Sequence, residues 1–422
     1  MHKARSWLCG TTVVALATAV ALASAASAAY GNSGNSRAAK KSPIKIGTIL
    51  PLSGPGSQYP EVLAGARAAV RGINTAGGID GHPLQLVWCD DQNDVNQGEA
   101  CARKMVSQGV VVMAGGYGNY GAQELPILNT KHIPEFGEEV QDSSLEYNAP
   151  TEFDLDPGAL GTFATGAVYG TQVLHDKTFS LTGQDFPVVV AIAKTAQKSV
   201  QIVGGKWEGF NAIPATATDM DPYVAAAASS KSQLVLAAMG NTTFIQFALS
   251  AERSGYSFTT LYPGVANTIS EYKQMGPNTP FGRHLLFASP VPPKSATAQF
   301  PTLKIFNKNI AAEYKSGDSQ ASTGNYSISQ EQEWYAIYAL SKIMNLIPTS
   351  RINAASITKE LNKAKDVNFG LQPPWTSPTI DKGPKGYTRV NTFYQYLLKL
   401  SPTGQLELAH PRPVNVKKAL GL

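Results

Sequence analysis

The residues that come nearest to a known chemical motif form a glycine-rich turn, Gly116-Tyr117-Gly118-Asn119-Tyr120-Gly121. The turn fits the pattern G-x-G-x-x-G, follows an apolar strand-like segment and precedes a helix-like one. In dinucleotide-binding proteins such a turn holds a pyrophosphate at a helix N-terminus, and a later acid holds the ribose. Glu138, 17 residues after Gly121, has a suitable position. However, Pro126 shortens the helix and two strand–helix units come first, so a dinucleotide-dependent oxidoreductase is only an alternative.

Other catalytic or metal-binding arrangements are missing from the sequence. It has no His-Glu-x-x-His, no Gly-x-Ser-x-Gly and no pair of Cys-x-x-Cys motifs, and its histidines are isolated along the chain. The acidic segment from Asp90 to Asp94 lacks the spacing and the terminal glutamate of a calcium loop. We therefore expect a protein that is not an enzyme and that needs no cofactor or metal.

Two loops instead have the features of a binding site for a small molecule. One runs from Leu52 to Tyr59 and the other from Tyr117 to Gly121, and each leads into a predicted helix. Helix N-termini carry free N–H groups and a positive dipole, which favour a carboxylate or another acceptor. In an open parallel sheet both loops would lie at the carboxyl ends of strands, where ligands bind. Tyr59, Tyr117 and Tyr120 could supply apolar walls with polar tips.

The elements around these loops alternate between strands and helices. The pattern predicts strands at 44–50, 84–89 and 110–113 and helices from Pro60 and over 99–107. It then repeats, with strands at 178–182, 200–203 and 234–238, helices at 188–198, 243–253 and 331–347, and a last strand at 391–400. Fully apolar strands that alternate with helices indicate parallel sheets covered on both faces. We therefore expect two α/β lobes.

The N-terminal segment is typical of a secretory signal peptide. His2, Lys3 and Arg5 precede an apolar run from Trp7 to Ala23, and Ala26-Ser27-Ala28 is a small-x-small cleavage pattern. We expect a signal peptide over 1–28, with a retained membrane anchor as the alternative, and a flexible leader over 29–42. Cleavage of the signal peptide would remove Cys9 and leave Cys89 and Cys101, which would most simply form one disulfide in an exported protein. Two free buried thiols are the alternative.

The composition excludes several classes of protein. Of the 422 residues 43% are hydrophobic and only 15% are charged, whereas disorder requires high charge and few apolar residues. The net charge of +5 is interspersed along the chain rather than gathered in a basic stripe, so no nucleic-acid partner is expected. The sequence has a single long apolar run, so we do not expect an integral membrane protein.

Several segments together resemble the branched-chain amino-acid type of periplasmic binding protein, the extracellular receptor of an ABC importer. The segments are Pro51-Leu52-Ser53-Gly54-Pro55, Ile73-Asn74-Thr75-Ala76-Gly77-Gly78-Ile79 with Gly81, Asp90-Asp91-Gln92-Asn93-Asp94, Gly264-Val265-Ala266-Asn267 and Lys385-Gly386. The resemblance covers about residues 43–410. It implies two doubly wound parallel-sheet lobes joined by three crossovers that act as a hinge. Relatives also often join cysteines at the places of Cys89 and Cys101.

The resemblance predicts how the chain divides between the lobes. The crossovers would lie near 155–160, 287–292 and 375–385. Lobe 1 would consist of residues 43–157 and 290–378, and lobe 2 of residues 158–289 and 379–422.

The resemblance also implies a ligand site between the lobes. In relatives the aromatic residue at Tyr59 packs on the ligand, and an aromatic residue at Phe186 faces it from the second lobe. The candidate ligand-binding residues are Ser53, Ser57, Gln58, Tyr59, Tyr117, Asn119, Tyr120, Gly137, Glu138, Asp185, Phe186, Asn241 and Tyr262.

Two of these positions depart from the pattern of amino-acid binders. Those proteins have an ammonium-binding acid just before the Gly-Val-Ala-Asn segment, where this chain has Tyr262-Pro263. Glu138 lies where carboxylate contacts are expected and would repel a carboxylate. Asp185 or Glu138 could instead bind an ammonium. We expect a ligand such as an amino acid or its derivative, an amide or an aromatic compound, and leucine fits poorly.

The resulting hypothesis is an exported, periplasmic or cell-surface solute-binding protein of an ABC importer. It would act as a monomer, capture a small molecule by hinge closure and deliver it to the permease subunits. A secreted ligand sensor of the same fold is the alternative.

Overall fold

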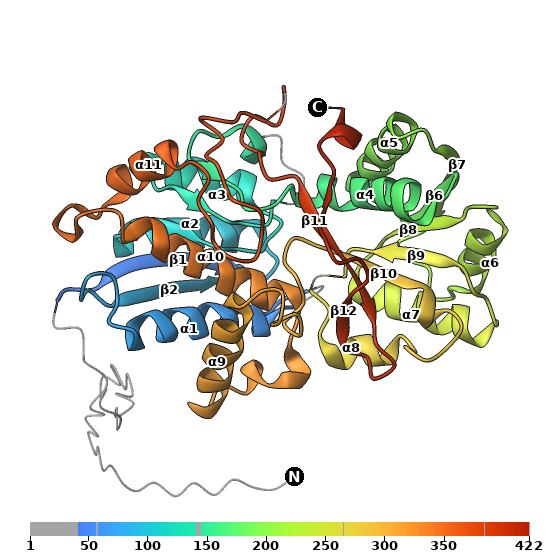
Figure 1. The fold of residues 1–422 in the computed structure, drawn as a ribbon, viewed down its shortest axis with the longest axis horizontal. Coiled ribbons are helices and arrows are strands. Elements are labelled where there is room, and N and C mark those ends of the chain that lie inside the picture. The colour runs from blue at the N-terminus through green and yellow to red at the C-terminus, as the bar shows by residue number, and fades with distance from the viewer. Residues whose placement is uncertain (1–40, 56–57, 141–144, 265, 384, 422) are drawn as a thin grey trace, which may run out of the picture. The chain divides into compact units, whose positions relative to one another are not determined.

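The computed structural model of the protein describes residues 41–55, 58–140, 145–264, 266–383 and 385–421. The predicted signal peptide and nearly all of the predicted leader lie outside the described residues. The described residues belong to one compact unit, which contains two β-sheets (Figure 1). Within the described ranges, no helix combines the length and the apolar composition that crossing a bilayer requires.

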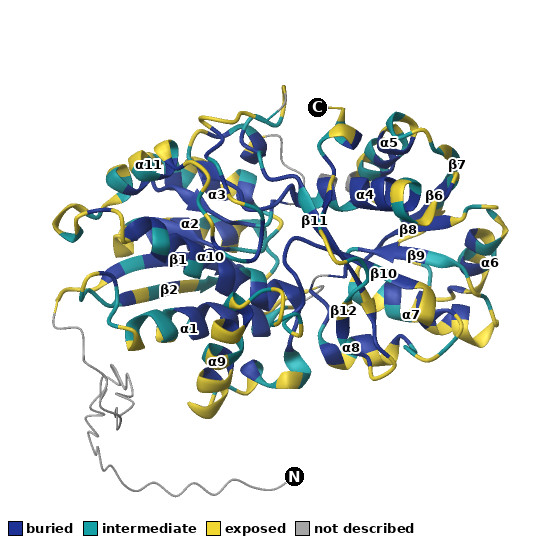
Figure 2. Ribbon diagram, in the orientation of Figure 1, coloured by how far each residue is buried: buried dark blue, intermediate teal, exposed yellow. Residues whose placement is uncertain are grey.

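The first sheet has five parallel strands in the order β2-β1-β3-β4-β5. They are β1 (Ile44–Leu50), β2 (Leu84–Asp90), β3 (Val112–Ala114), β4 (Glu135–Phe136) and β5 (Glu152–Phe153). β1 and β3 are buried over nearly their whole lengths (Figure 2), as their apolar sequences predict. β4 and β5 have only two residues each, and no apolar run in the sequence marks them.

Among the described residues, six α-helices pack around this sheet. They are α1 (Pro60–Thr75), α2 (Val95–Gln108), α3 (Gly121–Leu128), α9 (Thr302–Lys315), α10 (Ile328–Met344) and α11 (Ala354–Lys363). α1 begins with Pro60, which suits the first helical position, and packs against α10 and α9. The contact with α10 requires Gly65, because a Cβ there would lie 2.2 Å from the carbonyl oxygen of Gln330.

The second sheet follows the order β12-β11-β10-β9-β8-β6-β7, and β13 pairs with β11 beside this path. Its strands are β6 (Thr178–Gln184), β7 (Lys206–Ile213), β8 (Leu234–Ala238), β9 (Thr259–Tyr262), β10 (Leu285–Ser289), β11 (Tyr394–Leu400), β12 (Leu406–Leu408) and β13 (Val414–Asn415). Strands β6 to β10 pair in parallel, whereas β11 to β13 pair antiparallel. The expected parallel sheet is therefore found, with an antiparallel addition from the C-terminal segment.

The helices of the second sheet are α4 (Gly158–Tyr169), α5 (Pro187–Ile202), α6 (Asp221–Ser229), α7 (Asn241–Arg253) and α8 (Ile269–Gln274). The strand predicted at 200–203 is wrong, because α5 continues to Ile202 and the strand is β7. Val200 is fully buried on the inner face of the helix, which explains the apolar run that suggested a strand. β7 is an edge strand of mostly half-exposed residues, so it lacks such a run.

The chain passes between the two sheets three times. It leaves the first sheet after β5, returns after β10 to form α9, α10 and α11, and joins the second sheet again at β11. The predicted lobe limits, 43–157 with 290–378 and 158–289 with 379–422, stay a prediction at the level of individual residues.

The two cysteines of the described chain form a disulfide. Cys89 at the end of β2 is bonded to Cys101 on α2, with their Cα atoms 5.6 Å apart. The bond fastens α2 to the strand that precedes it. The pair therefore forms the expected disulfide and not two free buried thiols.

Candidate ligand-binding site

A cavity of about 450 Å³ lies where loops from both sheets meet. Its walls come from the segments that follow β1, β3, β4, β6, β8 and β9, together with α4 and α5. The lining residues are Tyr59, Tyr117, Asn119, Glu139, Ala159, Thr162, Phe163, Gln184, Phe186, Val189, Ile192, Ala238, Met239, Gly240, Asn241, Tyr262, Pro263, Gly264 and Ala266. All six strands point their carboxyl ends at this cavity, as expected for ligand sites in open α/β sheets. Its volume is in the range of small-molecule sites.

The first sheet contributes a pair of tyrosines to the cavity. Tyr59 is the residue before α1, and Tyr117 lies in the loop after β3. Their rings meet edge to face with centroids 4.9 Å apart, an arrangement that stabilises aromatic pairs. The pKa of Tyr117 lies well above its usual value, mainly because the residue is buried and secondly because of the neighbouring Tyr59. Its hydroxyl therefore remains protonated at neutral pH and can donate a hydrogen bond.

The opposite wall belongs to the second sheet. Phe186 directly precedes α5, and 41% of its surface is exposed. Gln184, at the end of β6, accepts a hydrogen bond on Oε1 from the backbone N–H of Gly240 at 2.9 Å. This bond ties the loop after β6 to the loop after β8, so both loops are held together at the cavity.

Tyr262 and Asn241 form the base of this wall. The hydroxyl of Tyr262 donates to Oδ1 of Asn241 at 3.0 Å, and its ring stacks on Phe244 with centroids 3.7 Å apart. Since Tyr262 is buried and protonated, its hydroxyl fixes the direction of the Asn241 amide. The Nδ2 of Asn241 contacts the carbonyl oxygen of Ala266 at 3.5 Å.

The polar groups of the cavity carry little charge. Among the described lining residues the one carboxyl is Glu139, and there is no lysine, arginine or histidine. The remaining polar groups are the tyrosine hydroxyls, Thr162 and the amides of Asn119, Gln184 and Asn241. Such a lining suits a neutral or cationic ligand better than an anionic one.

The glycine-rich turn is occupied by carboxylates of the protein itself. The backbone N–H of Gly116 donates to Oε2 of Glu333 at 2.8 Å. A Cβ at Gly121 would lie 2.0 Å from Oε1 of Glu146, and a Cβ at Gly116 would lie 3.4 Å from Cγ of Glu138. A pyrophosphate on this turn would meet these acids, so the geometry disfavours the dinucleotide alternative.

The structure brings six of the candidate residues together around the cavity. They are Tyr59, Tyr117, Asn119, Phe186, Asn241 and Tyr262. Gln58 lines a second hollow of about 350 Å³, which shares Tyr59, Asn241 and Ala266 with the cavity. Ser57 lies outside the described residues.

The other candidates lie away from the cavity lining. Ser53 donates from Oγ to Asp90 Oδ2 at 2.5 Å, and the hydroxyl of Tyr120 donates to the carbonyl of Asn93 at 2.7 Å. Asp185 is exposed, and Gly137 and Glu138 are buried.

Sequence reasoning missed several lining residues, among them Glu139, Gln184 and Gly240. Glu139 and Gln184 are each one position away from a candidate that does not line the cavity, Glu138 and Asp185. The available signal was the position of these residues just beyond a strand end. Where consecutive side chains point in different directions, sequence alone does not tell which one faces the ligand.

Comparison with known proteins assigns the chain to a class. A family model described as "Periplasmic binding protein" matches residues 43–381, so the chain belongs to this family. The family implies a location outside the cytoplasm. The proteins to which the chain is similar include several that bind or transport branched-chain amino acids according to their names.

The curated relatives match only one part of the chain. The Leu/Ile/Val-binding protein of Escherichia coli (strain K12) is 41% identical over 73 residues, which are 17% of this chain and 20% of that protein. Leu/Ile/Val-binding protein homolog 3 of Brucella melitensis is 40% identical over 73 residues, with the same coverage. The match thus spans about a fifth of the length of these relatives.

Solved structures match the fold over most of the chain. An ABC transporter substrate-binding protein from Sphaerobacter thermophilus has a TM-score of 0.71 at 16% identity, covering 90% of this chain and 100% of that one. A solute-binding protein from R. palustris in complex with 4-hydroxybenzoate has a TM-score of 0.69 at 18% identity, covering 90% and 99%. The branched-chain amino acid transporter substrate binding protein LivJ from Streptococcus pneumoniae, in complex with isoleucine, has a TM-score of 0.65 at 18% identity, covering 88% and 99%.

Proposed function

We propose that this protein is the extracytoplasmic solute-binding protein of an ABC importer, and that it captures a small molecule in the cavity between its two sheets. The observation that carries this proposal is the cavity lining, which combines loops from the carboxyl ends of strands in both sheets. The protein would act as a monomer and deliver its ligand to the membrane subunits of the permease.

Hinge closure explains how one ligand can change the state of the whole molecule. A ligand that contacts Tyr117 on one side and Phe186 on the other interacts fully only when both walls approach it. Differential affinity of this kind shifts an equilibrium between open and closed conformations toward the closed one. The three chain crossings between the sheets are the natural place for the bending.

We further propose that the ligand is neutral or cationic and has a flat apolar part. Tyr59, Tyr117 and Phe186 offer aromatic contacts, while Asn119, Gln184 and Asn241 offer amide hydrogen bonds. Glu139 is the residue that would accept from an ammonium or an amide N–H group. An aromatic amide or amine, or an amino-acid derivative without a free carboxylate, satisfies these groups better than leucine does.

The experiment that tests this proposal is a thermal-shift screen with matched pairs of compounds. Each pair keeps one ring or side chain and presents it once as a carboxylate and once as the amide or amine. We expect some amides or amines to raise the melting temperature more than their carboxylate partners do. A complete absence of shifts across amino acids, amides, aromatic acids and amines would refute the proposed function.

Two variants connect a shift to the cavity. Tyr117→Ala removes one aromatic wall and should abolish the shift. Tyr314→Ala is the matched control, because Tyr314 lies on α9 outside the cavity lining with 54% of its surface exposed. A shift that survives Tyr117→Ala unchanged would place the ligand elsewhere.

A further inference from the structure

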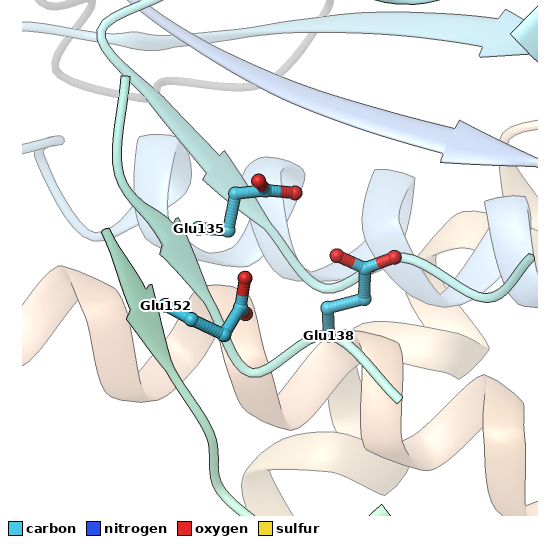
Figure 3. A group of neighbouring side chains, drawn as sticks. All are labelled: Glu135, Glu138 and Glu152. Carbon is cyan, nitrogen blue, oxygen red and sulfur yellow. The ribbon is translucent and has the colours of Figure 1, made fainter. Parts of the chain in front are cut away.

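Three buried glutamates converge at the edge of the first sheet, away from the ligand cavity lining. They are Glu135 on β4, Glu138 in the loop after β4 and Glu152 on β5 (Figure 3). One carboxylate oxygen from each lies within 4.8 Å of the others. The exposed fractions of the three residues are 3%, 8% and 0%, so the group is shielded from solvent.

The register of the sheet forces two of these acids together. Glu135 is the direct partner of Glu152 across the parallel strands β4 and β5, so both side chains leave the same face of the sheet. Like charges directly opposite each other destabilise a sheet. The Glu135 carboxyl is hydrogen-bonded to that of Glu138, which brings the third acid into the group.

Glu152 provides an observation that is independent of this grouping. It is fully buried, and neither of its carboxylate oxygens has a hydrogen-bond partner among the residues that the structure describes. Figure 3 shows its carboxylate pointing toward the other two glutamates. Asp154, two residues further along, is also buried, and within the described part of the chain both of its carboxylate oxygens are unpartnered. Burying carboxylate oxygens without partners costs free energy, and a cation coordinated by these oxygens would remove that cost.

Among the described residues, no lysine, arginine or histidine forms an ion pair with Glu135, Glu138 or Glu152. Arg389 is the cation that interacts with Glu152 and Asp154. However, its Nε donates to the backbone carbonyl of Glu152 at 2.7 Å, and its guanidinium lies over the ring of Phe153. The other groups acting on Glu135 and Glu152 are the acids Glu124, Glu146 and Asp154, which add negative charge.

We propose that Glu135, Glu138 and Glu152 bind one calcium ion. Calcium takes carboxylate oxygens at about 2.3–2.6 Å, so two oxygens on opposite sides of the ion are about 4.6–5.2 Å apart. The three oxygens lie within 4.8 Å of one another, close enough to contact one such ion together. Magnesium binds at about 2.0–2.1 Å in near-ideal octahedral geometry and usually keeps several waters, which suits a buried group of three carboxylates less well.

Such an ion would affect the ligand cavity through the backbone that connects Glu138 to a residue of the cavity lining. It would fasten β4 to β5 and fix the loop after β4 at Glu138. The next residue, Glu139, lines the cavity. The sequence predicted no metal, because these ligands come from strands of two residues that no motif marks. The calcium site does not depend on the identity of the transported ligand, so the two proposals can fail separately.

The test uses the protein without its predicted signal peptide (residues 1–28). The protein is treated with EDTA and then titrated with calcium at pH 8. The alkaline pH is chosen because burial raises the pKa of Glu135 and Glu152 well above the usual range for a carboxyl. We expect one calcium ion per chain by equilibrium dialysis, and a melting temperature that rises with calcium. Glu152→Gln should weaken calcium binding by about tenfold or more, since calcium affinity depends on the count of charged ligands.

The matched control is Glu331→Gln. Glu331 is equally buried, on α10, but accepts a hydrogen bond from the Tyr326 hydroxyl at 2.8 Å and is not among the three acids. This variant should bind calcium like the unaltered protein. Failure of the EDTA-treated protein to bind calcium, or equal calcium affinity of Glu152→Gln and the unaltered protein, would overturn the proposal.

A measurement on the unaltered protein covers the case in which Glu152→Gln does not fold. Terbium replaces calcium at oxygen sites, and its luminescence lifetimes in H₂O and D₂O report the water molecules that remain bound. We expect terbium to displace calcium at one site and to keep few waters there. A terbium ion that retains most of its hydration would lie on the surface and would contradict a buried three-carboxylate site.

Discussion

The backbone N–H of Gly116 donates a hydrogen bond to Oε2 of Glu333 at 2.8 Å, so the turn after β3 is attached to α10. The other oxygen, Oε1, accepts from the hydroxyl of Thr48 on β1, also at 2.8 Å. One buried carboxyl thus connects a strand, a helix and the loop that carries Tyr117. This contact explains how the glycine-rich turn is held so that Tyr117 lines the cavity.

Gly115→Ala should disturb this connection. Gly115 has a φ of +70°, and a Cβ there would lie 2.2 Å from Glu333 Oε2. Gly109→Ala is the matched control, because Gly109 has a φ of +71° but no atom of a described residue lies within 4 Å of the added Cβ. Both variants should lose about 1–2 kcal/mol of unfolding free energy from the left-handed backbone. Only Gly115→Ala should lose more and bind ligand more weakly. Equal losses in urea titrations would show that Glu333 moves aside freely.

Phe186→Ala should separate ligand affinity from stability. Because 41% of the Phe186 surface is exposed, its truncation should change the unfolding free energy by no more than about 0.5 kcal/mol. The ligand identified by the screen should bind at least about tenfold more weakly, which is about 1.4 kcal/mol. Leu249→Ala on α7, with the same 41% exposure, is the control outside the cavity lining. Calorimetric titration that finds the two variants alike would exclude Phe186 as a ligand contact.

Tyr262→Phe should act on ligand binding through Asn241. It removes the hydroxyl that donates to Asn241 Oδ1 at 3.0 Å but keeps the ring that stacks on Phe244. We expect a loss of about 1 kcal/mol in unfolding free energy and a weaker affinity for ligand. In a double-mutant cycle with Asn241→Ala the two effects should be non-additive by at least about 0.5 kcal/mol. Additive effects would mean that Tyr262 does not orient the amide.

Removal of the disulfide should reduce stability and leave ligand affinity unchanged. Cys89 and Cys101 are 12 residues apart, and a loop of that length corresponds to about 3 kcal/mol of unfolding free energy. We expect the double variant Cys89→Ser with Cys101→Ser to lose that amount in urea titrations while binding the screened ligand normally. A large loss of ligand affinity would show that the packing of α2 against β2 controls the cavity.

Glu61 should make stability depend on pH. It is buried at the start of α1, where its Oε1 accepts from Ser327 Oγ at 3.1 Å, and burial raises its pKa from 4.5 to about 8. The unfolded chain releases this proton near pH 4.5, and the folded chain only near pH 8. The stability gained from the protonated form is therefore complete below about pH 4.5 and is lost progressively up to about pH 8. The loss is at most about 5 kcal/mol, at 1.36 kcal/mol per pKa unit.

Glu61→Gln isolates this contribution. The amide keeps an acceptor for Ser327 but does not titrate. Urea titrations at pH 5, 6.5 and 8 should therefore show a smaller fall in unfolding free energy for the variant than for the unaltered protein. Parallel curves would assign the pH dependence to other buried acids.

The parts of the fold that sequence could predict are those with strong local patterns. Apolar runs in the sequence coincide with β1, β2, β3, β6 and β8. The helix α1 begins at a proline and ends before a glycine pair. β4, β5 and β7 could not be predicted in this way. Two of them have only two residues, and β7 is an edge strand with half-exposed side chains, so their positions depend on neighbours distant in sequence.

The site was predictable to the level of the loop but not of every side chain. Tyr59 and Tyr117 were predicted because their loops precede helices at strand ends, and both line the cavity. Glu138 was predicted in place of Glu139, because the direction of a side chain after a two-residue strand is set by tertiary packing. The group of Glu135, Glu138 and Glu152 depends on strand register, which no spacing in the sequence reveals.

The most direct measurement is a crystal structure of the exported protein with the strongest ligand from the thermal-shift screen. We predict electron density for the ligand in the cavity, with contacts to Tyr117 from the first sheet and to Phe186 or Asn241 from the second. A ligand bound outside this cavity, or one that contacts a single sheet only, would contradict capture between the two lobes.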